Sequence, residues 1–282
     1  MKFKKIRKYV NAAAKSKLAN NWAASVYLFI IVLLADLFFI IITQVLIAFS
    51  GINVLNQSFR TDITNLSFCI MLCLFLISRL IVSPLSLGYK TWTMRLGNVD
   101  EQYSQLITII TYFKDFKIYV RAMCLKIAIA FKVLVTFIIF LLPAFVMNII
   151  IRVLWNNPNQ VLDYMFFVFT FLALALLILG AILATIWCIN FFMTEYLFIR
   201  FNDIKINKAF KCSKKLIENR KKEVILLFII NLPRLICCIF IVPMFFLVPY
   251  MKKMYAEYAL GVINEQYDYI TNEINKSNKT RS

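Results

Sequence analysis

The chain has 282 residues, of which 62% are hydrophobic and only 16% are charged. A soluble domain of this length needs more charge to cover its surface, so the composition excludes that class and indicates a protein that uses lipid as its solvent. The net charge of +18 points to anionic lipid headgroups rather than nucleic acid, because the Lys and Arg residues flank apolar stretches.

Long apolar runs without alternation predict an all-α fold, a polytopic helical membrane bundle, rather than a β-barrel. A helix needs about 20 mostly apolar residues to cross the hydrocarbon core. Four segments meet this length, at about 22–50, 63–85, 124–151 and 161–192. A fifth apolar region contains Pro233, Pro243 and Pro249. If the prolines divide this region, it forms two further membrane segments, 223–240 and 243–262. If they do not, it forms one.

The number of Lys and Arg residues alternates from one connecting region to the next. There are seven in 1–21, one in 51–62, five in 86–121, one in 152–160 and nine in 193–222. The positive-inside rule therefore places the three basic regions on the cytoplasmic side. Five further basic residues follow residue 250 and place the tail there too. This favours six membrane segments, with five segments and an external tail as the alternative.

The expected organisation follows from these segments. We expect a cytoplasmic basic amphipathic helix over 1–21, a helical transmembrane domain over 22–262 and a polar cytoplasmic tail over 263–282. Both termini are then cytoplasmic, in a multi-pass protein of the cell membrane.

Three stretches combine lysines with apolar residues at helical spacing, at 1–21, 103–120 and 204–222. The last, "IKINKAFKCSKKLIENRKK", is the most regular. Such helices usually lie in the membrane interface with their lysines toward acidic headgroups. The candidate headgroup contacts are Lys205, Lys208, Lys211, Lys214 and Lys215. The stretch anchors the protein or, alternatively, senses lipid or docks a partner.

One carboxylate, Asp36, interrupts the apolar run "VLLADLFFIII". An ionised acid at the centre of a span costs about 2.5–3.5 kcal/mol, so it needs a partner, water or a proton. Arg234 is the partner best matched in depth, while Arg79 lies shallower and Lys132 is a further buried cation. These four residues form a candidate intramembrane polar site for an ion, a proton or an anionic amphiphile. The alternatives are an internal Asp36–Arg234 pair that holds helices together and an acid that stays protonated.

The sequence lacks residues and motifs that enzymes commonly use. Histidine is absent, which removes the commonest general base and the commonest zinc or haem ligand. The seven cysteines include no CxxC pair, and no P-loop, GxGxxG or HExxH motif occurs. We therefore expect no enzyme, no disulfide, no metal site and no cofactor.

Three stretches in order resemble the DUF975 family of bacterial integral membrane proteins. They are "AAAKSKLANNWAASVYLFII", "SPLSLGYKTWTMRL" and "NDIKINKAFKCSKKLIENRKKEVILLFI" with "LVPYMKKMYAEYAL" behind it. The resemblance extends from residue 12 to about 262 and implies six helices with both ends cytoplasmic. It implies no activity, because the family has none established. The chain departs from the family in "LICCIFIVPMFFLVPY", where prolines stand in place of the usual glycines.

Two functional hypotheses follow, and neither includes nucleic acid as a partner. In the first, the chain binds or translocates a small or amphiphilic solute, alone or as a permease subunit with a partner ATPase that docks on 193–222. In the second, it is a membrane scaffold or regulatory protein that assembles with partner proteins or anionic lipid. The oligomeric state does not follow from the sequence.

Overall fold

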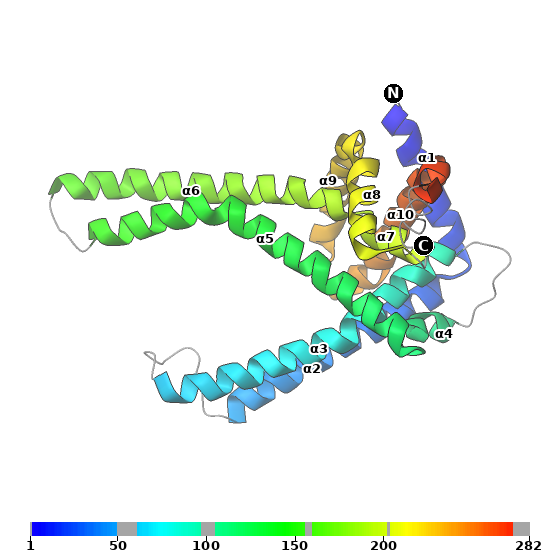
Figure 1. Ribbon diagram of the computed structural model, residues 1–282, viewed down its shortest axis with the longest axis horizontal. Coiled ribbons are helices and arrows are strands. Elements are labelled where there is room, and N and C mark those ends of the chain that lie inside the picture. The colour runs from blue at the N-terminus through cyan, green and yellow to red at the C-terminus, as the bar shows by residue number, and fades with distance from the viewer. Residues whose placement is uncertain (1, 50–60, 97–104, 156–159, 202–203, 273–282) are drawn as a thin grey trace, which may run out of the picture. The chain divides into compact units, whose positions relative to one another are not determined.

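The computed structural model describes residues 2–49, 61–96, 105–155, 160–201 and 204–272 (Figure 1). Within these residues all regular structure is helical, as predicted. The chain divides into two compact units. Unit 1 comprises Met1–Cys124 with Ile229–Tyr267, and unit 2 comprises Leu125–Phe228 with Asp268–Ser282.

Four helical stretches in the described residues are long and apolar enough to cross a membrane. They are Trp22–Leu46, Met71–Arg95, Phe116–Arg152 and Phe167–Arg200. These stretches belong to α2 (Trp22–Phe49), to α3 (Thr61–Arg95), to α5 (Phe116–Trp155) and to α6 (Gln160–Cys188) with η2 (Ile189–Phe191) and α7 (Thr194–Arg200). They correspond to the four long segments predicted from the sequence.

The predicted fifth and sixth segments form α9 (Lys221–Cys237) and α10 (Ile241–Glu265). The chain therefore divides here into two helices, as the favoured prediction of two segments expected. Neither helix is among the four that are long and apolar enough to cross a membrane. Six crossings consequently stay a prediction.

Helix boundaries differ from those expected around the second and third predicted segments. The second segment was predicted to end at residue 85, but α3 continues to Arg95. The stretch 103–120 is not one amphipathic helix, because α4 (Gln105–Ile109) and the 3-10 turn η1 (Ile110–Phe113) precede a new helix, α5. Asp115 explains that start: its carboxylate accepts a hydrogen bond from the backbone N–H of Lys117 at 2.9 Å, which caps the first turn of α5.

The core of unit 1 lies where α2 and α3 approach α4. Leu28 and Phe29 of α2 pack with Tyr89 and Trp92 of α3 and with Ile109 of α4. Apolar residues early in α10 cover this cluster, and α1 (Lys2–Ala19) packs on α10. Burial of these large side chains explains why α3 continues as a helix past Pro84.

The core of unit 2 lies where α8 (Ile206–Glu218) packs on η2 and α7. The rings of Phe191 and Phe210 meet edge to face there, with centroids 5.6 Å apart. Farther along, α6 approaches α5 at Gly180, where any side chain would clash with the carbonyl of Phe140. Close approach at a glycine is typical of helix pairs in membranes.

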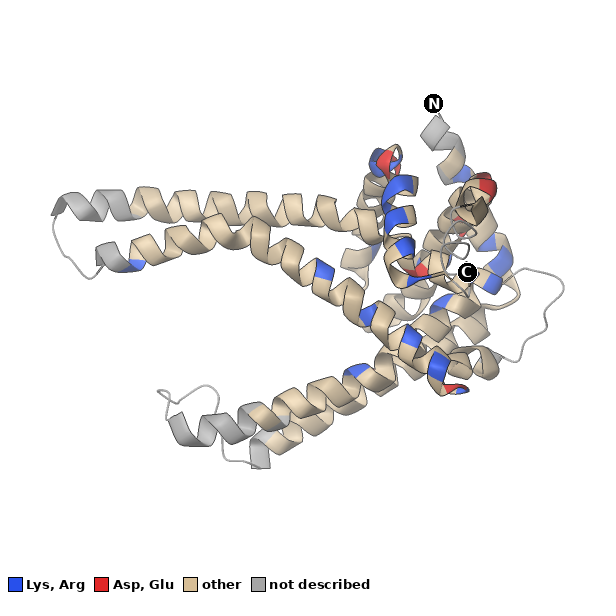
Figure 2. Cartoon of the chain, viewed as in Figure 1, with Lys and Arg blue, Asp and Glu red and all other residues tan. Residues whose placement is uncertain are grey.

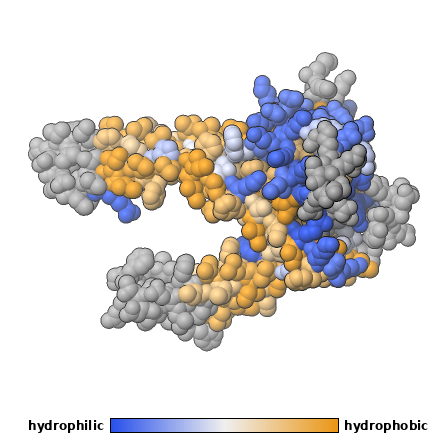
Figure 3. Space-filling model, viewed as in Figure 1, coloured by the Kyte–Doolittle hydropathy of each residue, from blue (hydrophilic) through white to orange (hydrophobic). Residues whose placement is uncertain are grey.

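Hydrophobic residues cover the surfaces of the two long helix pairs, α2–α3 and α5–α6 (Figure 3). Large apolar side chains there are well exposed, including Phe38 at 59%, Phe145 at 67% and Phe171 at 75%. Their exposure fits lipid as the solvent. Along α5 the basic residues gather in the first half, with Arg152 alone near the other end (Figure 2). Each feature is that of a helical membrane protein.

Candidate functional site

The predicted Asp36–Arg234 pair is absent from the described residues. Asp36 is half-buried in α2 and makes neither a hydrogen bond nor an ion pair within the described part of the chain. The Arg234 guanidinium instead donates to Asn231 Oδ1 at 2.8 Å and lies 3.8 Å from Met254 Sδ. It also lies 5.0 Å from the ring centroid of Tyr250. Local partners on α9 and α10 therefore hold this cation.

The other two members of the predicted polar site have aromatic neighbours. Arg79 is exposed on α3, with its guanidinium 4.9 Å from the ring centroid of Phe75. Lys132 is half-buried in unit 2, with Nζ 3.7 Å from the ring centroid of Phe210. Such cation–π contacts are worth about 0.5–2 kcal/mol. The four predicted residues thus share no common partner among the described residues.

The lysines of α8, with Lys205 directly before its first residue, form a face of their own, which we call the α8 lysine face. Lys205, Lys211, Lys214 and Lys215 are exposed and Lys208 is half-buried. The opposite face of the helix is buried, through Ala209, Phe210, Cys212, Leu216 and Ile217. Since protein covers the apolar face, α8 does not insert that face into lipid, contrary to the usual behaviour of interfacial helices. The exposed side of α8 carries its lysines.

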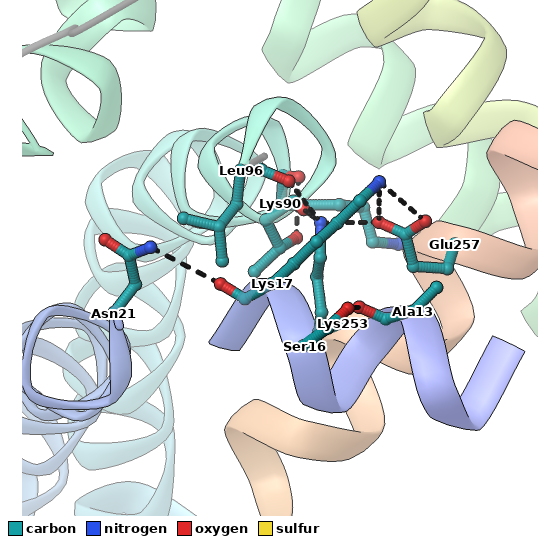
Figure 4. Close-up of polar contacts among 9 residues, drawn as sticks. Ala13, Ser16, Lys17, Asn21, Lys90, Leu96, Lys253 and Glu257 are labelled. Carbon is teal, nitrogen blue, oxygen red and sulfur yellow. Dashed lines mark hydrogen bonds and ion pairs between the residues drawn. The ribbon is translucent and has the colours of Figure 1, made fainter. Parts of the chain in front are cut away.

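Unit 1 contains a buried ion cluster that was not predicted from the sequence, formed by Lys17, Lys253 and Glu257 from α1 and α10 (Figure 4). Lys253 Nζ lies 2.7 Å from Glu257 Oε1. Lys17 Nζ donates to both carboxylate oxygens at 3.0 Å. Lys253 is 0% exposed and Glu257 only 5%, whereas Lys17 reaches solvent. The spacing of Lys253 and Glu257 within apolar "KMYAEYA" was the available signal.

Lys253 also caps the end of α3. Its Nζ donates to the backbone carbonyls of Thr93 and Leu96, each at 2.8 Å. The last carbonyls of a helix have no partner within the helix and carry partial negative charge, so a cation is favourable there. Burial lowers the pKa of Lys253 to about 8, against an opposing contribution from Glu257. With three short contacts, the ammonium group is saturated and holds α3, α10 and α1 together.

Among the described residues of unit 2, two buried side-chain oxygen atoms have no hydrogen-bond partner. They are Asn190 Oδ1 and Thr194 Oγ1, and both residues lie where the long helix changes to 3-10 geometry between α6 and α7. Asn190 Nδ2 donates to Trp187 O at 2.9 Å, and Ser213 Oγ donates to Asn190 O at 2.6 Å. Unsatisfied buried oxygens are acceptors for a small polar ligand. The described residues hold no group of three or more Cys, Asp or Glu that fits a metal ion.

A comparison with protein families finds one match. Residues 1–266 fit the family described as "Protein of unknown function (DUF975)". The match extends over nearly the whole chain, and it confirms the resemblance seen in the three sequence stretches. No curated protein and no solved structure matches the chain.

Proposed function

The chain belongs to the DUF975 family, and from that premise we propose that it is a membrane scaffold of the bacterial plasma membrane that binds anionic lipid headgroups. The α8 lysine face carries this proposal. Its apolar side is covered by η2 and α7, while Lys211 and Lys214 are exposed. A covered apolar face with free charge suits an electrostatic contact.

The location of α8 supports the same function. Lys132 of α5 lies over Phe210 of α8, so α8 meets α5 at one of the basic residues of its first half. The positive-inside rule assigns that end to the cytoplasm, where the leaflet is anionic. Each lysine near such a surface contributes about 1 kcal/mol of attraction. Several lysines on one face then select anionic lipid over zwitterionic lipid.

The test uses the full chain in nanodiscs of phosphatidylcholine with phosphatidylglycerol. One variant combines K205Q, K211Q and K214Q, and its matched control combines K205R, K211R and K214R, which keeps the charge. We expect phosphatidylglycerol to be enriched around the wild type and the arginine control, in a salt-sensitive manner, and not around the glutamine variant. Equal lipid composition around all three proteins, measured by mass spectrometry after extraction, would contradict the proposal.

A solute-binding or transport function is the second candidate, with a partner ATPase docking on α8 if transport is driven. The specific observation in its favour is the helix interruption at η2, with the unpartnered oxygens of Asn190 and Thr194. Interrupted helices whose free polar atoms face inward are how many transporters bind small ions. Proteoliposome assays of proton and sodium flux, with T194V and N190L as variants, test it. Absence of flux in the wild type rejects the candidate, and flux unchanged by D36N removes Asp36 from it.

A further inference from the structure

The connection between α9 and α10 is apolar throughout. Residues 237–243 read "CCIFIVP", with no charged residue and no Asn, Gln, Ser or Thr. Four successive side chains are largely exposed: Ile239 at 78%, Phe240 at 69%, Ile241 at 70% and Val242 at 70%. We call Ile239–Val242 the apolar tip. A turn between two membrane-crossing helices lies in water or among headgroups, where such a surface is unfavourable.

The apolar parts of the two helices are too short to cross a bilayer. From Val224 to Cys237, α9 offers 14 mostly apolar residues with Arg234 as the one charge among them, or about 21 Å at 1.5 Å per residue. From Ile241 to Met251, α10 offers 11 residues, or about 16 Å. The hydrocarbon core is about 30 Å thick. Beyond Met251, α10 carries the ion cluster and packs on α1, so that part of the helix is not in lipid.

Ring contacts fix the position of α10 along α2 within unit 1. Phe246 packs against Trp22, the first residue of α2, with ring centroids 6.2 Å apart. Phe245 packs against Phe29, two turns farther, at 6.3 Å. If α10 crossed the membrane from the outer side, its first residues would lie beside the far end of α2, near residue 46. They lie beside its beginning instead.

The Arg234 contacts bring the last turn of α9 close to the middle of α10. Arg234 lies one turn before the end of α9, yet it touches Tyr250 and Met254, far along α10. A continuing helix would carry Met254 roughly 30 Å away, at 1.5 Å per residue. In the sequence, Lys221 and Lys222 at the beginning of α9 and the charged part of α10 from Lys252 onward flank the stretch 224–251, in which Arg234 is the one charged residue.

We propose that α9–α10 inserts into one leaflet and returns without crossing. The apolar tip contacts the acyl chains of the leaflet that α2 enters at Trp22. The chain then crosses the membrane four times, and both ends remain on one side. Four crossings satisfy the distribution of basic residues as well as six do, because an insertion from one side leaves Lys222 and Lys252 on the cytoplasmic face.

Cysteine accessibility tests this topology. A cysteine-free background with single substitutions I239C, K222C or E265C is labelled with a membrane-impermeant maleimide from either side of the membrane. We expect K222C and E265C to react from the same side and I239C to react from neither. Reaction of I239C from the side opposite K222C would establish two crossings, and reaction of K222C and E265C from opposite sides would establish one. Either result overturns the proposal.

Lipid contact is measured separately, because protein could also shield the tip. A bimane fluorophore on I239C is expected to be quenched by lipids brominated near the top of the acyl chain. Absence of quenching would show that the tip is covered by protein and would overturn the proposal. If the cysteine-free background does not fold, the native Cys237, which is exposed beside the tip, gives the same labelling readout in the wild type by peptide mapping. The outcome does not depend on lipid binding by α8.

Discussion

Lys253 of unit 1 and two lysines of α8 in unit 2 show opposite uses of the same residue type. Lys253 of unit 1 is fully buried, and its three short contacts go to Glu257 and to two carbonyls at the end of α3. Lys211 and Lys214 of unit 2 lie on the exposed side of a helix whose other side is packed. The same residue type therefore fastens helices at Lys253 and presents charge at Lys211 and Lys214. Lys126 of unit 2, which pairs with Glu195 at 2.7 Å, fastens helices as Lys253 does. Burial and partners, rather than net charge, decide the role of each lysine.

The largest expected effect comes from removing the acid of the buried cluster. E257Q leaves Lys253 without a compensating charge inside the protein, and breaking a buried pair typically costs about 3–5 kcal/mol. We expect the free energy of unfolding in detergent to fall by about that amount, with amide exchange rising in α1 and α10. The control is E218Q, an exposed acid at the end of α8. Equal effects of both variants would show that the cluster does not hold unit 1 together.

The second effect is a dependence of stability on pH. The pKa of Lys253 is about 8 in the folded protein and 10.5 as an ordinary lysine. Between these values the unfolded chain holds a proton that the folded chain has released, so unfolding takes up a proton. The free energy of unfolding therefore rises with pH across this window, by up to about 1.4 kcal/mol per unit of pKa difference.

Comparison with K253M isolates that contribution, because every other titrating group is common to both proteins. We expect the wild type to gain more stability than K253M between pH 8 and pH 10.5, measured by thermal unfolding at constant ionic strength. Equal slopes would mean that Lys253 stays protonated throughout, held by Glu257 and the carbonyls of α3.

The third effect concerns the two close helix contacts, one in each unit. At Gly88 an added methyl group would clash with the Ile109 carbonyl, and at Gly180 with the Phe140 carbonyl. Because backbone cannot give way easily, we expect G88A and G180A each to lower the free energy of unfolding by about 1–3 kcal/mol. At Gly261 nothing lies within 4 Å, so G261A should be neutral or raise stability by up to about 1 kcal/mol. Destabilisation by all three variants would indicate loss of backbone flexibility instead of clashes.

The sequence predicted the features that depend on composition along one segment. The four long helices, the division of the fifth apolar region into two helices and the lysine face of α8 all follow from hydropathy and periodicity. The partner of Arg234 does not follow from the sequence, because the depth of a residue along its helix does not determine which side chain it contacts. Asn231, three residues away on the same helix, satisfies it.

The ion cluster was not predicted from the sequence either, for a different reason. Lys253 looked like one more basic residue of a cytoplasmic flank, and its partners Thr93 and Leu96 are backbone carbonyls, which carry no sequence signal. Glu257 one helical turn away was the only local indication. Contacts that join distant helices through backbone atoms require the fold itself.

The smallest expected effect comes from a direct comparison of the buried Lys253 with the exposed lysines of α8. Exposed substitutions away from packing usually change stability by less than about 0.5 kcal/mol. We therefore expect K211Q and K214Q to leave the free energy of unfolding in detergent unchanged within that limit. K253Q, the same change of residue, should lower the free energy of unfolding by several times that limit, because it removes the cap of α3 and one of the two lysine partners of Glu257. Thermal unfolding of the three variants in one neutral detergent measures this difference without any contribution from lipid. Strong destabilisation by K211Q or K214Q would show that these lysines stabilise the fold. Loss of lipid selection in the glutamine variant could then no longer be attributed to the charge of the α8 lysine face.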